Sequence, residues 1–210
     1  MARHLPIDIY MRLLGLDKDC FSSWWAKLPE GSTMVVQPKI DGCAIGLRYK
    51  YGQLVDAYSR DDSEIIENIR NINSIPLSID DSLKVEVELE GVLYTPFSNS
   101  KISIEQLLSN SFSKIDNSTS ILFKAFQIFC SKSDELSDLT QLQNWGFEVP
   151  ITLRTDDPRQ VKRWHSQWIK NELFSNLPTN GIVAKCNSSL TKNILGASPY
   201  APNWALALTR

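Results

Sequence analysis

The chain has 210 residues, is 42% apolar and 22% charged, and carries a formal net charge of −2. This length suits one large domain or two small ones, and the composition is that of an ordinary globular protein. The charge excludes the strongly basic signature of a stand-alone nucleic-acid binder, and no apolar run is long enough for a transmembrane helix. The N-terminus lacks a signal-peptide core and the four cysteines form no C-x-x-C pair. We therefore expect a cytoplasmic protein with no membrane association, no disulfide framework and no zinc ribbon.

Apolar periodicity and turn signals predict helices and strands in an irregular order. In chain order these are a helix over 7–14, a helix over 17–28, a strand over 33–36, a hairpin of strands over 43–50 and 53–60, a helix over 64–72, a strand over 84–94, a helix over 102–108, a loop over 109–120, a strand over 121–129, helices over 133–145 and 157–174, and strands over 180–186 and 204–208. Residues 1–30 form a helical lead-in. Such an order indicates an α+β fold of mainly antiparallel sheets flanked by helices. No linker or repeat divides the chain, so we predict a single domain over 1–210.

The stretch Gln37-Pro38-Lys39-Ile40-Asp41-Gly42 follows the strand over 33–36. One interpretation of Lys39 is a solvated loop lysine, the usual fate of this residue type. The other is a nucleophilic amine beside a glycine that lets a ligand approach, with Asp41 supplying a carboxylate. This stretch alone leaves both open.

Two further patterns bear on that choice. The hairpin brings Arg60, at the end of its return strand, back towards Lys39. The strand over 84–94 alternates strictly, so that Glu86, Glu88 and Glu90 share one face. A solvated acidic face is the plainer interpretation, and the alternative is that Glu90 faces a site.

Taken in order, several stretches resemble the adenylation (nucleotidyltransferase) domain of NAD-dependent bacterial DNA ligases. They are Leu14-Gly-Leu-Asp17, Pro38-Lys-Ile-Asp-Gly42, Tyr58-Ser-Arg60, Asn68-Ile-Arg-Asn-Ile72, Ile75-Pro-Leu77, Asn180-Gly-Ile-Val-Ala-Lys185 and Ala201-Pro-Asn-Trp-Ala-Leu-Ala207. The resemblance implies the ligase-type nucleotidyltransferase fold. It also implies a reaction in which a lysine takes AMP from NAD, with Mg²⁺, and passes it to the 5′-phosphate of nicked DNA.

The resemblance implies a role for particular residues. By position Lys39 is the nucleophile, Asp41 orients it or the ribose, and Lys185 contacts the α-phosphate. Arg60 and Lys185 are the cations that would help the amine lose its proton. The residues implied in nucleotide binding are Gln37, Ile40, Gly42, Arg60, Glu90 and Phe126, although the core is the plainer interpretation of Phe126. No protein metal ligand is assigned.

Three departures from the family pattern keep other functions open. Gln37 replaces a glutamate, Asn180 replaces an acid, and Thr209 stands where the last motif has a lysine. The sequence also shows no nicotinamide-binding helical domain, oligonucleotide-binding barrel, zinc finger or helix-hairpin-helix. We expect weak binding to nicked DNA by this chain alone, and a second chain supplying the missing domains. The alternatives are a non-catalytic subunit of a split ligase and an ATP-using polynucleotide ligase relative.

Overall fold

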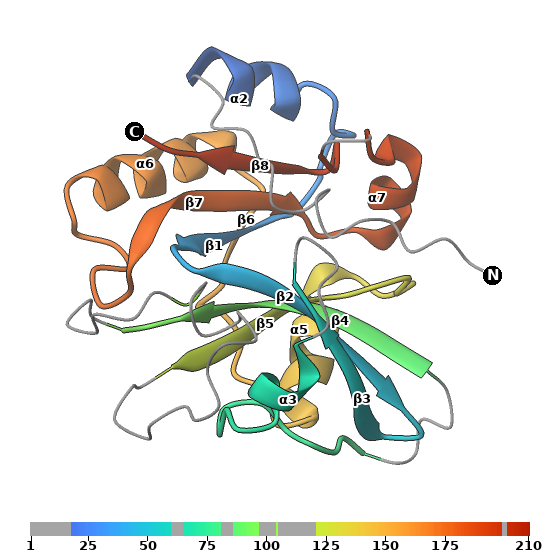
Figure 1. The fold of residues 1–210 in the computed structure, drawn as a ribbon. Helices are drawn as coiled ribbons and strands as arrows, with labels where there is room; N and C mark the ends of the chain where they lie inside the picture. Colours follow the sequence, from blue (N-terminus) through green and yellow to red (C-terminus); the bar gives the residue numbers. More distant parts are fainter. Residues whose placement is uncertain (1–17, 60–64, 81–85, 97–103, 105–120, 199–200) are drawn as a thin grey trace. The chain divides into compact units, whose positions relative to one another are not determined.

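The computed structural model of the protein describes residues 18–59, 65–80, 86–96, 104, 121–198 and 201–210 (Figure 1). The described residues fall into two compact units. The first unit takes the described residues within 1–40, 132–137 and 151–210, and the second those within 41–131 and 138–150. Among these described ranges, no helix is both long and apolar enough to span a bilayer.

The first unit is built on a four-stranded antiparallel sheet in the order β6-β1-β7-β8 (Figure 1). Its strands are β1 (Met34–Ile40), β6 (Leu153–Thr155), β7 (Thr179–Cys186) and β8 (Ala205–Leu208). Its helices are α2 (Lys18–Trp25), α6 (Pro158–Ile169) and α7 (Ser189–Leu195). Side chains of α2 and α6 pack on one face of the sheet. That core comprises Phe21, Trp24, Leu28, Met34, Val36, Val161, Trp168, Phe174, Ile182, Ala184, Cys186, Trp204, Ala205, Leu206 and Leu208.

Pro38 lies inside β1, a central strand, where proline is normally excluded because it has no N–H for the ladder. The short length of β6 explains the exception. β6 pairs only with Met34–Val36, so Pro38 lies beyond its end and pairs only with Ile182 of β7. The backbone is therefore extended through Lys39, which is a strand residue and not part of a turn.

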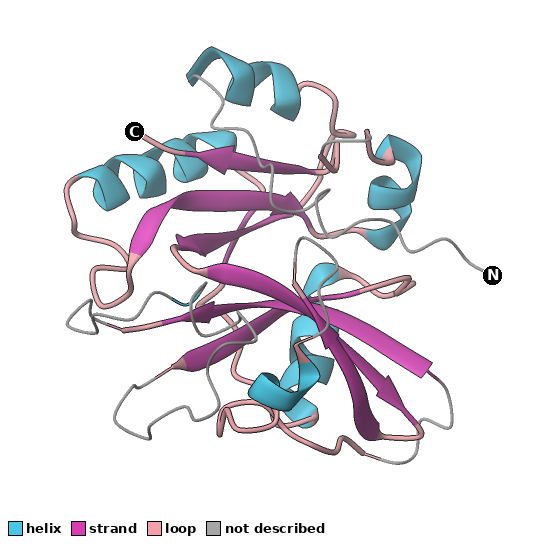
Figure 2. Ribbon diagram, in the orientation of Figure 1, coloured by secondary structure: helices cyan, strands magenta, loops and turns pink. Residues whose placement is uncertain are grey.

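The second unit is built on a sheet in the order β3-β2-β4-β5, labelled in Figure 1, again with antiparallel pairs, and Figure 2 draws these strands in magenta. Its strands are β2 (Cys43–Lys50), β3 (Gln53–Tyr58), β4 (Glu86–Tyr94) and β5 (Leu122–Ile128), and its short helix is α3 (Ile66–Ile69). Helix α5 (Glu135–Asn144) starts in the first unit and continues in the second. Tyr49 and Phe123 each pack edge-to-face on Phe147, with ring centroids 6.0 Å apart, in the second core.

The α+β class and most strands agree with the prediction. Tyr51 and Gly52 both have positive φ, 51° and 74°, as a two-residue hairpin with a type I′ turn requires. Asp157 caps α6 by accepting from the Arg159 N–H at 2.8 Å, as the Asp-Pro signal predicts. Outside the described residues lie the predicted helix over 7–14, the loop over 109–120, all of the helix over 102–108 except Ile104, and Arg60.

Several predicted boundaries are wrong. The helices predicted over 17–28, 64–72 and 157–174 end earlier, at Trp25, Ile69 and Ile169, while residues 17 and 64 lie outside the described ranges. The sequence analysis did not predict β6 or α7. Helix α7 carries its own signals: Ser188 accepts from the Thr191 N–H at 3.3 Å, and Gly196 ends the helix with a φ of 62°. Strand β6 has only three residues, and its apolar pattern is too short to stand out.

Candidate functional site

One face of the first unit's sheet carries the predicted nucleophile and two of its predicted helpers. Residues directly opposite each other in an antiparallel ladder point to the same face. The ladder between β1 and β7 contains the pairs Lys39–Gly181, Gln37–Val183 and Val35–Lys185. Because side chains alternate along each strand, Lys39, Gln37 and Lys185 share one face. The other face of the same strands packs into the first core.

A β-bulge directs Asn180 at the predicted nucleophile. The register moves from the pair Lys39–Gly181 to the pair Ile40–Thr179, which leaves Asn180 as the extra residue of β7. A bulge re-aims the side chain of its extra residue. Here Lys39 Nζ donates a solvent-exposed hydrogen bond of 2.7 Å to Asn180 Oδ1, although the Lys39 residue as a whole is half-buried. The amine is thus oriented by an acceptor that carries no charge.

Gln37 is buried, with 2% of its surface exposed. Its Nε2 donates to Thr152 Oγ1 at 3.0 Å. The resemblance assigns this amide to an adenine edge. In the structure one N–H of this amide donates to Thr152, so an adenine contact would use the second N–H or the carbonyl oxygen of Gln37.

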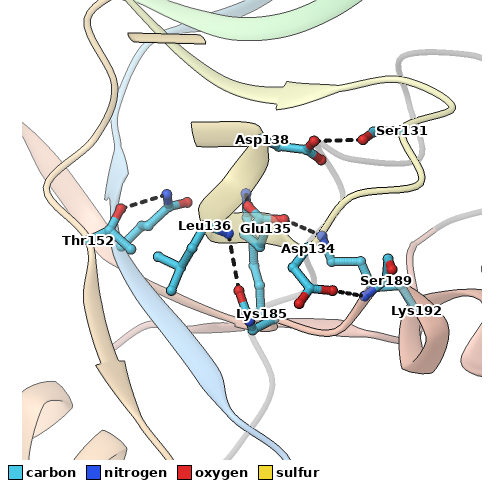
Figure 3. A network of polar contacts seen from close by, with 11 residues as sticks. Ser131, Asp134, Glu135, Leu136, Asp138, Thr152, Lys185, Ser189 and Lys192 are labelled. Atoms are coloured by element: carbon cyan, nitrogen blue, oxygen red, sulfur yellow. Dashed lines mark hydrogen bonds and ion pairs between the residues drawn. The ribbon is translucent and has the colours of Figure 1, made fainter. Parts of the chain in front are cut away.

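Lys185 is also buried, and it is held by Glu135, which the sequence analysis did not single out. Its Nζ donates to Glu135 Oε1 at 2.7 Å, and Glu135 Oε2 accepts from Lys192 Nζ (Figure 3). Burial opposes ionisation of Glu135, but the two ammonium groups outweigh it and hold the pKa of this carboxyl below its ordinary value. The acid lies 50 and 57 positions from its two lysines, so no local pattern could have revealed the cluster.

The C-terminal residues show whether Arg210 could stand in for the lysine that Thr209 replaces. Arg210 follows Thr209 and lies over the Trp168 ring, 5.6 Å from its centroid, on the side of the sheet that α6 covers. His165 Nε2 lies 2.9 Å from the Thr209 carbonyl oxygen. A Cβ added to Gly181 would come within 3.1 Å of Thr209 Cγ2. Arg210 therefore does not replace the lysine of the last motif on the Lys39 face.

In the second unit, Glu90 differs from the acids that share its face. Glu86 is exposed and Glu88 is half-buried, and both contact Arg48, at 3.2 Å and 2.8 Å. Glu90 is fully buried at the centre of β4. The solvated acidic face is therefore correct for Glu86 and wrong for Glu90. Burial and Glu88 together raise the pKa of the Tyr58 hydroxyl, on the neighbouring β3.

Phe126 is the extra residue of a second bulge. The pairing of β4 with β5 moves from Gly91–Ala125 to Glu90–Gln127, which leaves Phe126 unmatched. Its side chain is half-buried, whereas Phe123 on the same strand is fully buried. The plain core interpretation thus describes Phe123 better than Phe126.

Gly42 has a structural reason to be glycine. A Cβ at this position would lie 2.1 Å from the Leu93 carbonyl oxygen of β4, so the two backbones meet with no room for a side chain. The neighbouring Asp41 is exposed and Ile40 is half-buried. The close approach of the two backbones is enough to require glycine at position 42, whether or not a ligand also binds there.

The described side chains offer no preformed metal cage. Within those ranges, no three His, Cys, Asp or Glu residues are grouped so that they could hold an ion. Mg²⁺ is usually bound by water, substrate phosphates and one or two carboxylates, and such binding does not require a cage of this kind.

Comparison with known proteins places this geometry in a family. A profile of the NAD-dependent DNA ligase adenylation domain matches residues 15–120, half of the chain. The DNA ligase of Mycoplasma genitalium is 29% identical over 82% of this chain and 29% of its own length. That of Borrelia turicatae is 29% identical over 95% of this chain and 32% of its own length. The chain thus spans about a third of these relatives.

Solved structures share the fold at low sequence identity. An archaeal ATP-dependent RNA ligase aligns with 96% of this chain and 47% of its own, at a TM-score of 0.61 and 12% identity. The ATP-dependent DNA ligase of bacteriophage T7, in complex with ATP, aligns with 93% of this chain and 66% of its own, at a TM-score of 0.54 and 10% identity. These likenesses establish the nucleotidyltransferase fold and nothing finer.

Proposed function

Because the chain belongs to the family of NAD-dependent DNA ligase adenylation domains, we propose that it accepts AMP from NAD on Lys39. The observation that carries the proposal is the hydrogen bond of 2.7 Å from Lys39 Nζ to Asn180 Oδ1. It orients an amine on the sheet face that also bears Gln37 and Lys185. A solvated loop lysine needs no such partner.

The proposed step exchanges one bond for another. The lone pair of the neutral Lys39 amine attacks the α-phosphorus of NAD and forms an N–P bond. The P–O bond to the nicotinamide mononucleotide breaks, and that phosphate leaves with the electron pair, while the amine proton passes to solvent. The product is a phosphoramidate, lysyl-AMP. A divalent cation, when bound, neutralises phosphate charge.

The other proposed contacts follow the chemistry of each side chain. Lys185 supplies a positive charge for the α-phosphate. Gln37 and Glu90 supply polar groups for the adenosine, and Phe126 supplies an aromatic ring on which a base can stack. Asp41 orients the amine or the ribose, while Ile40, Gly42 and Arg60 complete the proposed nucleotide contacts. The acceptor of the AMP is the 5′-phosphate of nicked DNA, with other domains or chains completing the joining.

Intact mass spectrometry tests the proposal. The chain is incubated with Mg²⁺ and NAD, and separately with Mg²⁺ and ATP. A mass increase of one AMP with NAD, lost in Lys39→Ala and kept in the exposed-lysine control Lys170→Ala, is the expected result. Labelling with ATP alone would make the donor ATP, and no adduct with either nucleotide in a folded sample would refute the proposal.

A second candidate function is a nucleotide-binding module without turnover. It is favoured by the engagement of the Lys185 ammonium with Glu135 and by the absence of a cation at Thr209. Nucleotide binding without any covalent adduct would select this candidate over the first.

A further inference from the structure

A single buried carboxylate is shared by two lysines that come from different elements. Glu135 begins α5, Lys185 is on β7 and Lys192 is on α7, and their side chains converge in Figure 3. The exposed fractions of the three side chains are only 3%, 6% and 12%. Each carboxylate oxygen binds one ammonium group. The carboxylate therefore keeps a cation even when one of the two lysines leaves it.

The backbone around Glu135 is fixed independently of its carboxylate. Its own N–H donates to the Asn187 carbonyl oxygen at 2.9 Å, and the Leu136 N–H donates to Asn187 Oδ1 at 3.1 Å. In return, the Ser189 N–H donates to Asp134 Oδ1 at 2.8 Å. Loss of the ion pair with Lys185 would leave these three hydrogen bonds in place, so Glu135 stays where it is.

The two lysines are not equivalent. The Nζ of Lys192 lies 4.7 Å from the centroid of the Trp204 ring, a cation–π contact that holds it near Glu135. Lys185 instead extends from the face of the sheet that carries Lys39, where the nucleotide phosphate would lie. Lys185 is thus the lysine that can change its partner.

From this arrangement we propose that Glu135 is a positioning residue that holds Lys185 in the absence of nucleotide and exchanges it for the nucleotide's phosphate. Lys192 keeps the Glu135 charge compensated during the exchange. A carboxylate oxygen and a phosphate oxygen offer an ammonium the same kind of charge-assisted hydrogen bond, so the two compete for Lys185. That the competing anion is a nucleotide phosphate rests on the proposed function. That Lys185 can leave Glu135 rests on the contacts of the triad formed by Glu135, Lys185 and Lys192.

Competition gives the two partners of Lys185 opposite effects on nucleotide affinity. Glu135→Gln removes the competing charge, so phosphate binds more tightly. Lys192→Met removes the second ammonium from Glu135, so the carboxylate attracts Lys185 more strongly. Phosphate then binds more weakly. A role limited to folding would lower stability in both variants and would leave the affinity of the folded protein unchanged.

Calorimetric titration of the full chain with AMP measures these effects. AMP carries the α-phosphate but no leaving group, so no covalent transfer complicates the binding. Because a hydrogen bond between charged groups is strengthened or weakened in each variant, we expect a change in Kd of at least about tenfold in each direction, or about 1.4 kcal/mol. Lys170→Met, at an exposed lysine after α6, is the matched control and should keep the wild-type Kd.

The outcomes are separable. Tighter binding in Glu135→Gln with weaker binding in Lys192→Met supports the exchange. Unchanged affinity in both variants, weaker binding in Glu135→Gln, or no AMP binding by any variant overturns it. Thermal melts check folding; if Glu135→Gln fails to fold, Glu135→Asp shortens the acid's reach, keeps its charge and predicts the same tightening. Failure of NAD to label Lys39 would refute the transfer reaction alone and leave the AMP titrations to decide the exchange.

Discussion

Replacing Glu135 with alanine is expected to lower the free energy of unfolding by about 3–5 kcal/mol, the usual cost of removing one partner from a buried ion pair. The acid accepts charge-assisted hydrogen bonds from both Lys185 and Lys192. Most of the loss should come from Lys185, whose side chain is 6% exposed, because a buried ammonium left without its carboxylate keeps its desolvation cost. Lys192 is less affected, since its 12% exposure and its contact with Trp204 remain.

Urea unfolding at neutral pH, followed by tryptophan fluorescence, measures this loss. Trp24, Trp168 and Trp204 all lie in the first core and report on the unit that holds the triad. Glu67→Ala is the matched control, because Glu67 is 84% exposed and its pair with Arg70 spans 3.6 Å. We expect that control to change stability by less than about 0.5 kcal/mol. A cost for Glu135→Ala below about 1 kcal/mol would show that the triad does not stabilise the fold and would refute the reasoning.

The pKa of Glu135 is lowered on folding from an ordinary 4.5, so its stabilising contribution is present above about pH 4.5 and is lost as the pH falls towards the lower folded value. Urea midpoints measured across this range should fall more steeply for the wild type than for Glu135→Gln, and parallel curves would contradict this. Gly42→Ala should cost about 1–3 kcal/mol, since its Cβ would meet the Leu93 carbonyl oxygen at 2.1 Å. Gly31→Ala meets nothing within 4 Å and should cost about 1–2 kcal/mol for its φ of +76° alone, whereas a loss below about 1 kcal/mol at Gly42 would contradict the packing argument. Lys185→Ala should slow adenylation without preventing nucleotide binding, and unchanged labelling rates would remove it from the site.

Patterns local in the sequence predicted most of the fold. The alternation of β4, the positive-φ turn at Tyr51-Gly52 and the capping signal at Asp157 each depend on residues that are neighbours in the chain. Whether such a strand, turn or cap forms depends on the backbone geometry of a few consecutive residues, and the types of those residues favour that geometry. The α+β class followed from the order of these elements.

The features that the sequence did not reveal depend on residues far apart. The bulges at Asn180 and Phe126 arise where two ladders slip by one residue, and neither strand alone specifies that slip. The burial of Glu90 also could not be predicted from its own strand, because Glu86 and Glu88 follow the same alternation and stay more exposed. Glu135 looked like an ordinary acid at the start of a helix, and only the fold brings Lys185 and Lys192 to it.

The sequence predicts a strand over 33–36 before the lysine motif, and the structure extends this strand to Ile40. Pro38 stood against such an extension, since proline is normally excluded from a central strand. The short length of β6 frees that position from its second ladder, a fact that only the paired sheet contains. The extended backbone then sets which side chains share a face with Lys39, and this arrangement underlies the proposed site.

The most direct test of the central claim counts both products of a single turnover with NAD. The chain is mixed with NAD and Mg²⁺, the free nicotinamide mononucleotide is quantified, and the AMP-bearing peptide is identified by tandem mass spectrometry. We expect equal amounts of released mononucleotide and chain-bound AMP, with the AMP on Lys39. Release without an adduct, or an adduct on Lys185 or any other residue, would contradict the assignment of Lys39 as the nucleophile.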